Sequence, residues 1–116
     1  MNNWKIFCLS IYNKNNNFFQ ELTYTPVGLG KANFNKDWIS DKSGVNISNK
    51  NSYYGEYTFH YSIWKNYLES LKNQKWIGFC TYRRFWSSKN INNGSIEDLK
   101  NNVITHPAKD WDNSEV

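Results

Sequence analysis

The chain has 116 residues, of which 39% are hydrophobic, 21% charged and 18% aromatic, and its formal net charge is +4. This length and composition indicate a single globular domain and exclude a disordered chain. No apolar run approaches the ~20 residues that cross a bilayer, and the first residues lack a signal-peptide pattern. We therefore expect no transmembrane segment and a cytoplasmic location.

The positive charge does not by itself predict a nucleic-acid-binding protein. The basic residues are scattered along the chain, with no run and no stripe at helical spacing. Nearly all are lysines, and the two arginines, Arg83 and Arg84, are adjacent. Cys8 and Cys80 lack the spacing of a zinc site, so we expect them to be reduced thiols of the core.

The first half of the chain alternates between an apolar run and polar sequence. Residues Lys5–Ser10 form a short apolar run, which predicts a buried strand. Thr25–Gly30 contains one Pro and two Gly, which predict a loop. Residues 31–52 show no sustained period and predict a long loop, which Trp38 and Ile39 would hold against the core.

A helix is predicted over Tyr53–Leu71, capped by Asn51 or Ser52 and with Glu56 near its positive end. Because its apolar residues form two stripes, we expect this helix to be covered on two sides. The stripes consist of Phe59, Ile63 and Tyr67, and of Tyr57, Tyr61, Trp64, Leu68 and Leu71.

The second half of the chain predicts two further strands and a short helix. The strands are Trp76–Tyr82 and Val103–His106, and a capping box at Ser95–Asp98 begins the helix between them. This order of elements predicts an α/β fold with a parallel sheet.

The arginine pair is the first candidate for chemistry. Arg83 and Arg84 follow a predicted strand, and open α/β sheets bind ligands beyond the carboxyl ends of their strands. Guanidinium groups bind phosphate through two hydrogen bonds, so the diphosphate of a sugar nucleotide is a plausible ligand. The alternative is a surface ion pair.

A polar cluster precedes the predicted helix. Asp41, Asn46, Ser48 and Glu56 could bind sugar hydroxyls or a nucleotide, and the alternative is turn and cap chemistry. His60 lies four residues after Glu56, which favours a structural contact over a catalytic base.

Metal binding and other catalytic classes have little support. Asp110 and Asp112 form an Asp-x-Asp pattern of the kind that holds Mg²⁺ or Mn²⁺, but they lie in a terminal segment where fraying is the alternative. We assign no metal site, and the two aspartates are its only candidates. P-loop, zinc-protease and hydrolase-elbow motifs are absent from the sequence.

Five segments together resemble a bacterial family with a domain of unknown function. Its members occur in capsular and exopolysaccharide gene clusters and are regarded as glycosyltransferases. The segments are Tyr24–Gly28, Asp41–Asn51, Tyr54–Thr58, Tyr61–Asn66 and Ile77–Phe85, the last of which matches the family's "IG-x-x-HYRR-[YF]" pattern. Thr81 replaces the usual His of this pattern, and Gly55 stands where Cys is common.

The resemblance implies a partial GT-A-like, Rossmann-like fold with a nucleotide-sugar donor and a glycan or lipid-linked acceptor. Residues 1–107 would form the N-terminal part of the domain and 108–116 a tail, truncated before the acceptor half, so whether the chain alone is an enzyme is open. Arg83 and Arg84 would stabilise the diphosphate leaving group. The other donor-site residues implied are Asp41, Asn46, Ser48, Glu56, Tyr61, Trp64, Lys65 and Tyr82.

Two other functions stay open at this stage, and no catalytic residue is identified. A non-catalytic carbohydrate-binding domain would expose Trp38, Trp86 and Trp111 on one open face. An aromatic-rich single-strand nucleic-acid binder would gather its cations on one face, which the scattered charge disfavours.

Overall fold

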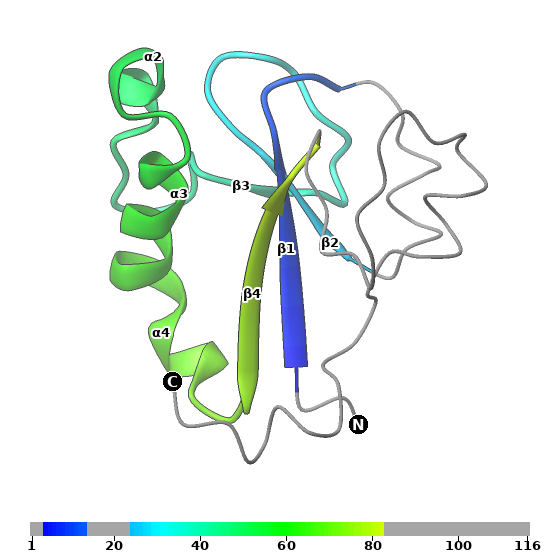
Figure 1. Ribbon diagram of the computed structural model, residues 1–116. Coiled ribbons are helices and arrows are strands. Elements are labelled where there is room, and N and C mark those ends of the chain that lie inside the picture. The colour runs from blue at the N-terminus through cyan, green and yellow to red at the C-terminus, as the bar shows by residue number, and fades with distance from the viewer. Residues whose placement is uncertain (1–3, 14–23, 83–116) are drawn as a thin grey trace, which may run out of the picture.

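The computed structural model describes residues 4–13 and 24–82, which form an α/β unit (Figure 1). Four parallel strands are ordered β3-β2-β1-β4, and the described helices cover one face of the sheet. The α/β class predicted from the sequence is therefore confirmed. The helix and strand expected at 95–98 and 103–106 lie outside the described residues.

The two apolar runs form strands that pair with each other, as the sequence predicts, and β4 lies at one edge of the described sheet. Strand β1 (Trp4–Ser10) pairs with β4 (Trp76–Thr81) in register, from Trp4 opposite Trp76 to Leu9 opposite Thr81. The Tyr82 N–H donates to the Leu9 carbonyl at 2.9 Å, so the pairing continues to the last described residue. Because β1 has neighbours on both sides, its last five residues are buried.

The loop expected at Thr25–Gly30 is wrong for its first four residues, which form strand β2 (Thr25–Gly28). The Leu29 N–H bonds to β1 at Ser10, whereas the Gly28 carbonyl accepts from Asp41 on the other side. Successive residues of a strand direct their main-chain N–H and C=O groups toward opposite neighbouring strands. The nitrogen of Pro26, which carries no hydrogen, therefore lies on the side away from β1. On that side β3 pairs only with Val27 and Gly28, so no ladder bond is lost.

The long loop expected over 31–52 contains short regular elements. Strand β3 (Ile39–Ser40) extends the sheet, and a 3₁₀ turn, η1 (Ser48–Lys50), leads into helix α2 (Asn51–Tyr54). Trp38 is buried as expected and stacks on Phe34, whose ring packs so closely on Gly28 that a Cβ there would lie 2.3 Å from it.

The predicted helix is present but is broken into segments. After α2 the chain turns at Gly55, whose φ of +54° favours glycine, and continues as α3 (Tyr57–Ser62), the π-helical η2 (Ile63–Tyr67) and α4 (Leu68–Leu71). The expected N-cap is wrong, because the residues at the N-caps of α2 and α3 are Lys50 and Glu56. The Asn51 amide instead donates to the Gly55 carbonyl at 2.8 Å, bracing the turn.

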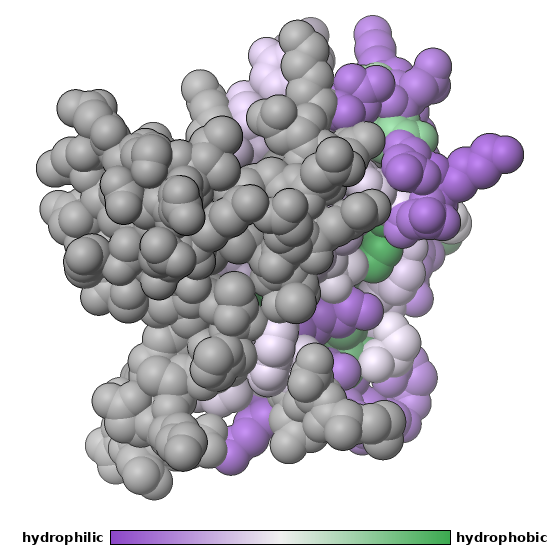
Figure 2. All heavy atoms as spheres, turned by 90° about the vertical axis from the view of Figure 1, so that its right-hand side faces the viewer, coloured by the Kyte–Doolittle hydropathy of each residue, from purple (hydrophilic) through white to green (hydrophobic). Residues whose placement is uncertain are grey.

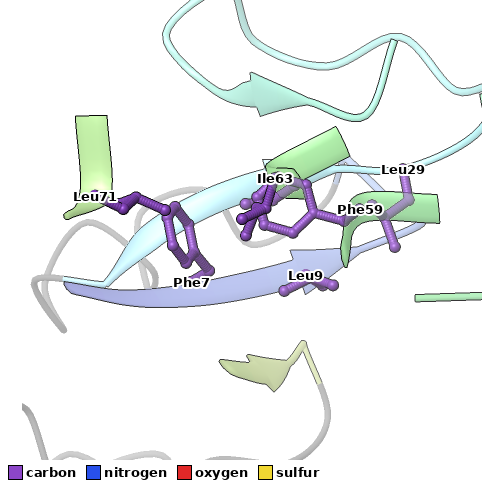
Figure 3. Close-up of a cluster of buried hydrophobic side chains, with 7 residues drawn as sticks. Phe7, Leu9, Leu29, Phe59, Ile63 and Leu71 are labelled. Atoms are coloured by element: carbon purple, nitrogen blue, oxygen red, sulfur yellow. The ribbon is translucent and has the colours of Figure 1, made fainter. Parts of the chain in front are cut away.

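One helix stripe packs on the sheet, as Figure 3 shows. Phe59 and Ile63 are buried against Phe7 and Leu9 of β1, and the Phe7 and Phe59 rings meet edge to face at 5.2 Å. Four-residue spacing would drift around an ideal α-helix. The wider turn of η2 compensates for this drift and brings Leu71 back to the buried side.

Most of the second stripe is exposed, which corrects the expectation of a helix covered on two sides. Of its members, Leu71 is buried and Tyr61 is half-buried. Tyr57, Trp64 and Leu68 are 67%, 59% and 54% exposed. In the view from the side opposite the helices, the described atoms that are visible are mainly hydrophilic (Figure 2). None of the described helices is long and apolar enough to cross a membrane.

The two stripes should differ in their effect on stability. Replacing Phe59 with Ala should lower the free energy of unfolding by about 3–5 kcal/mol, because it leaves a cavity between helix and sheet. The matched change Tyr57→Ala should alter it by less than about 0.5 kcal/mol, since that ring is mostly in solvent. Urea unfolding of both variants tests this, and equal losses would contradict the assignment of the two faces.

Candidate functional site

The order of the strands places a switch point between β1 and β4. The chain leaves β1 to build β2 and β3 on one side and returns through the helices to place β4 on the other. In open parallel sheets, ligands bind outside the carboxyl ends of the strands at such a point. Here the strands end at Ser10 and Thr81, so this is where a ligand site is expected.

Two tyrosines meet at the switch point. The rings of Tyr12 and Tyr82, which follow β1 and β4, contact edge to face at 5.3 Å. The Ser10 hydroxyl donates to the Tyr12 carbonyl at 2.6 Å and accepts from its N–H at 3.0 Å, which fixes the turn after β1. The Tyr12 side chain is 52% exposed, so it offers an aromatic surface to a ligand.

The sequence had indicated Tyr82 for this site but not Tyr12. Tyr12 lies in Asn-rich polar sequence, which carries no periodic signal. Its position two residues beyond a predicted strand was the signal that could have identified it.

Asp41 and Ser48, two of the expected binding residues, turn their polar atoms toward each other. The Asp41 carboxylate is fully buried and accepts hydrogen bonds from the Ser48 hydroxyl at 2.7 Å and the Thr58 hydroxyl at 2.6 Å. The Gly30 N–H donates to it at 3.2 Å. This carboxylate therefore joins the segments after β2 and β3 to helix α3 and has a positioning role.

The segment from Asp41 to Ser48 is held in place by two asparagines. The Asn46 amide donates to the carbonyls of Lys42 and Gly44 at 2.9 and 2.8 Å. Asn66 of η2 accepts from the Val45 N–H and donates to two carbonyls of the same segment. Asn46 is exposed but shapes its own loop, which is the turn chemistry weighed for it above.

The remaining expected residues on the helices lie apart from the switch point. Glu56 is exposed where α3 begins. Tyr61, Trp64 and Lys65 lie on the side of the helix turned away from the sheet, with the Lys65 ammonium 3.9 Å from the centre of the Trp64 ring. The described structure therefore does not bring these four side chains together with Tyr82.

Cations follow the carboxyl ends of the other strands. Lys31 lies three residues after β2, Lys42 lies two residues after β3, and both are exposed. Arg83 and Arg84 come directly after Tyr82 in the sequence but lie outside the described residues, as do Asp110 and Asp112. Within residues 4–13 and 24–82, no three His, Cys, Asp or Glu side chains are grouped to hold a metal ion.

Two thiols lie in β1 and β4, close to the carboxyl ends of both strands. Cys8 and Cys80 stand opposite each other on β1 and β4, both buried and reduced, as expected. A hydrogen bond with Cys8 and burial raise the pKa of the Cys80 thiol, and burial raises the pKa of the neighbouring Tyr24 hydroxyl. Both groups are therefore neutral at pH 7 and are poor nucleophiles there.

Comparison with known protein families assigns the chain. Residues 6–112 match a family described as "Domain of unknown function (DUF4422)". The chain belongs to this family. The match to DUF4422 covers all the described strands and helices except the first two residues of β1, and it includes Tyr12, Tyr82, Arg83 and Arg84. No curated protein and no solved structure matches the chain.

The Trp residues proposed for an open carbohydrate-binding face do not form one within the described residues. Trp38 is 8% exposed and stacks on Phe34, so it cannot stack on a sugar ring. Trp86 and Trp111 lie outside the described residues.

We expect loss of the Asp41 carboxylate to destabilise the fold. Asp41→Ala removes the acceptor of the Ser48 hydroxyl and the Gly30 N–H and one of the two acceptors within reach of the Thr58 hydroxyl, and should cost about 3 kcal/mol or more. Thr58→Val should cost about 1.5–3 kcal/mol, because it removes one hydrogen bond to the carboxylate. The exposed Ser43→Ala is the matched control and should be neutral.

Urea unfolding of these variants and of the Asp41→Ala/Thr58→Val double variant measures the coupling between the two side chains. Strictly additive losses would mean that the carboxylate does not hold α3.

The buried thiol should make stability fall at alkaline pH. An unfolded Cys ionises near pH ~8.5, and the raised pKa of Cys80 keeps the folded thiol neutral. Its contribution to stability is therefore full below pH ~8.5 and is lost as pH rises above it, by about 1 kcal/mol between pH 8 and pH 9.5. Urea unfolding should show a smaller loss over this interval for Cys80→Ala than for the parent. An equal loss of unfolding free energy in the parent and in Cys80→Ala would contradict the raised pKa of the Cys80 thiol.

Proposed function

We propose that this chain binds a nucleotide-sugar donor at the switch point between β1 and β4. It would serve in the transfer of the sugar to a glycan or lipid-linked acceptor of capsular or exopolysaccharide synthesis. The observation that carries the proposal is the contact between Tyr12 and Tyr82 at the carboxyl ends of the two strands, followed in sequence by the arginine pair.

The chemistry of this end of the sheet suits a nucleoside diphosphate. An exposed Tyr ring can stack on a nucleobase, and the contact is worth about 1–3 kcal/mol for a stacked base. Lys31 and Lys42 add positive charge after the two neighbouring strands. The Asp41 carboxylate, which directly follows β3, is buried and engaged by its own donors, so it would not repel the phosphates from the surface.

Arg83 and Arg84 have the role of stabilising the diphosphate. Charge develops on the leaving diphosphate as the sugar bond breaks, and fixed guanidinium donors favour that state more than the ground state. The sequence resemblance of the Tyr82–Phe85 segment to polysaccharide glycosyltransferases supports this role. No general base is assigned.

The hydrogen bonds to the Asp41 carboxylate, here called the Asp41 network, support the main chain at the same end of the sheet as the proposed site. The network fixes the segments after β2 and β3, so the site would be formed before the ligand arrives and binding would order few side chains. A cytoplasmic location fits the two free thiols, which persist in a reducing compartment. Nucleic acid is not expected as a partner.

A thermal-shift screen with UDP-, GDP- and CDP-sugars tests the donor class. A ligand that binds only the folded chain raises the melting temperature by an amount that grows with the ratio of its concentration to its Kd, so at equal concentrations the tightest-binding nucleotide should give the largest shift. Free inorganic phosphate serves as the control for a nonspecific anion effect. A chain that no nucleotide sugar stabilises would overturn the proposal.

Substitutions should distinguish the contribution of the two arginines to nucleotide-sugar binding from that of Tyr12. Arg83→Ala and Arg84→Ala should each weaken binding by about 2–4 kcal/mol, because a charged hydrogen-bonding partner is lost. Tyr12→Ala should weaken it by about 1–3 kcal/mol, whereas Tyr53→Ala, which removes a ring that is 86% exposed on α2, should not. Titration calorimetry measures binding and the melting temperature monitors folding. Parental affinity in folded arginine variants would show that the site is misplaced.

A further inference from the structure

The uncovered side of the long helix is a surface that the proposed donor site does not use. This outer helix face consists of Tyr57, Tyr61, Trp64 and Leu68, which recur at intervals of four, three and four residues on successive turns. All except the half-buried Tyr61 are more than half exposed. Buried Phe59 and Ile63 fix the opposite side of the same helix to the sheet, so the outer helix face points away from the described sheet.

The residue types are those of a membrane interface. Tyr and Trp combine a large ring with a polar atom, and they are enriched where hydrocarbon meets lipid headgroups. Lys65 borders the face, with its ammonium 3.9 Å from the centre of the Trp64 ring and 5.8 Å from that of Tyr61. Such a pair can lower its aromatic ring toward hydrocarbon while the ammonium remains among headgroups.

The geometry of the rings disfavours a flat ligand. The Tyr61 and Trp64 rings stand at 83° to each other with their centres 5.7 Å apart, so no sugar ring or base could lie flat on both. The Lys65 ammonium also occupies one side of the Trp64 ring. A fluid surface needs no such coplanar platform, because lipids rearrange around each side chain.

The charges favour an anionic surface over a neutral one. The segment from 50 to 75 carries four lysines against two glutamates, a surplus of two positive charges, within a chain of net charge +4. One of these glutamates, Glu69, is ion-paired with Lys72 on the exposed side of the helix, which leaves Lys65 as the cation beside the rings. Each Lys near an anionic leaflet contributes about 1 kcal/mol.

We propose that the outer helix face binds the surface of an anionic phospholipid membrane, with the helix lying in the plane of the interface. The sheet would then face away from the lipid. Figure 1 shows α2 at the same end of the molecule as the carboxyl ends of β1 and β4, so the switch point would open beside the membrane surface. The proposal goes beyond the donor site and does not depend on it, although it would suit a lipid-linked acceptor.

Vesicle flotation of the full chain tests this face. The parent should float with vesicles of phosphatidylcholine containing phosphatidylglycerol and should bind pure phosphatidylcholine more weakly. Lys65→Gln should lower the partition coefficient on the anionic vesicles about fivefold, with little effect on the neutral ones. Leu68→Ser should lower it about tenfold on the anionic vesicles, because it removes a side chain that would be buried in the interface.

Val45→Ser is the matched control, since it removes an apolar side chain that is 60% exposed but lies off the helix. It should float like the parent. Parental flotation of Leu68→Ser and Lys65→Gln, or no flotation of the parent, would overturn the proposal. A concentration-dependent dimer that Leu68→Ser abolishes, without vesicle binding, would overturn it in favour of a second copy. The assay contains no nucleotide, so its result is separate from that of the donor screen.

Discussion

One buried carboxylate determines how the carboxyl end of this sheet is arranged. Asp41 lies where β3 ends and accepts hydrogen bonds from the segment after β2, from the start of η1 and from α3. A buried charge without donors would be strongly destabilising, so each of these segments is constrained to bring its donor to the same place. Two hydroxyls and a main-chain N–H meet that requirement among the described residues, without a cation in direct contact.

The same arrangement distinguishes polar side chains that hold the main chain from aromatic side chains that are free to contact a ligand or a surface. The polar side chains of Asp41, Ser48 and Asn46 form hydrogen bonds within the protein, and a ligand could use them only by breaking those bonds. The aromatic rings of Tyr12 and Trp64 are exposed on a fixed backbone. Rigid support under exposed aromatic side chains lowers the entropy that a ligand or surface must overcome on binding.

The sequence predicted the parts of the fold that depend on local pattern. The runs around Phe7 and Phe79 are strands, and the spacing of Phe59, Ile63 and Tyr67 identified the helix face that packs on the sheet. Strand β2 was missed because Pro26 normally interrupts a sheet, and only the short length of β3 makes it harmless here.

The candidate site was less predictable because it depends on distant partners. Asp41 and Thr58 are separated by 17 positions, and no local pattern shows that they meet. A polar residue in a loop and a threonine in a helix each have an ordinary local explanation. Tyr12 and Tyr82 are 70 positions apart and adjoin only because β4 returns beside β1.

The π-helical turn of η2 affects which residues of the helix face the sheet and which face outward. An insertion of one residue in an α-helix is commonly accommodated as a π-turn, which absorbs the extra residue without rotating the following segment. In this chain the turn allows four-residue spacing to keep Phe59, Ile63 and Leu71 on one side. In evolutionary terms, the family could gain or lose one residue there without rotating α4 against the sheet. Comparing the lengths of natural variants between Ile63 and Tyr67 would therefore show whether the aromatic side has been retained as a unit.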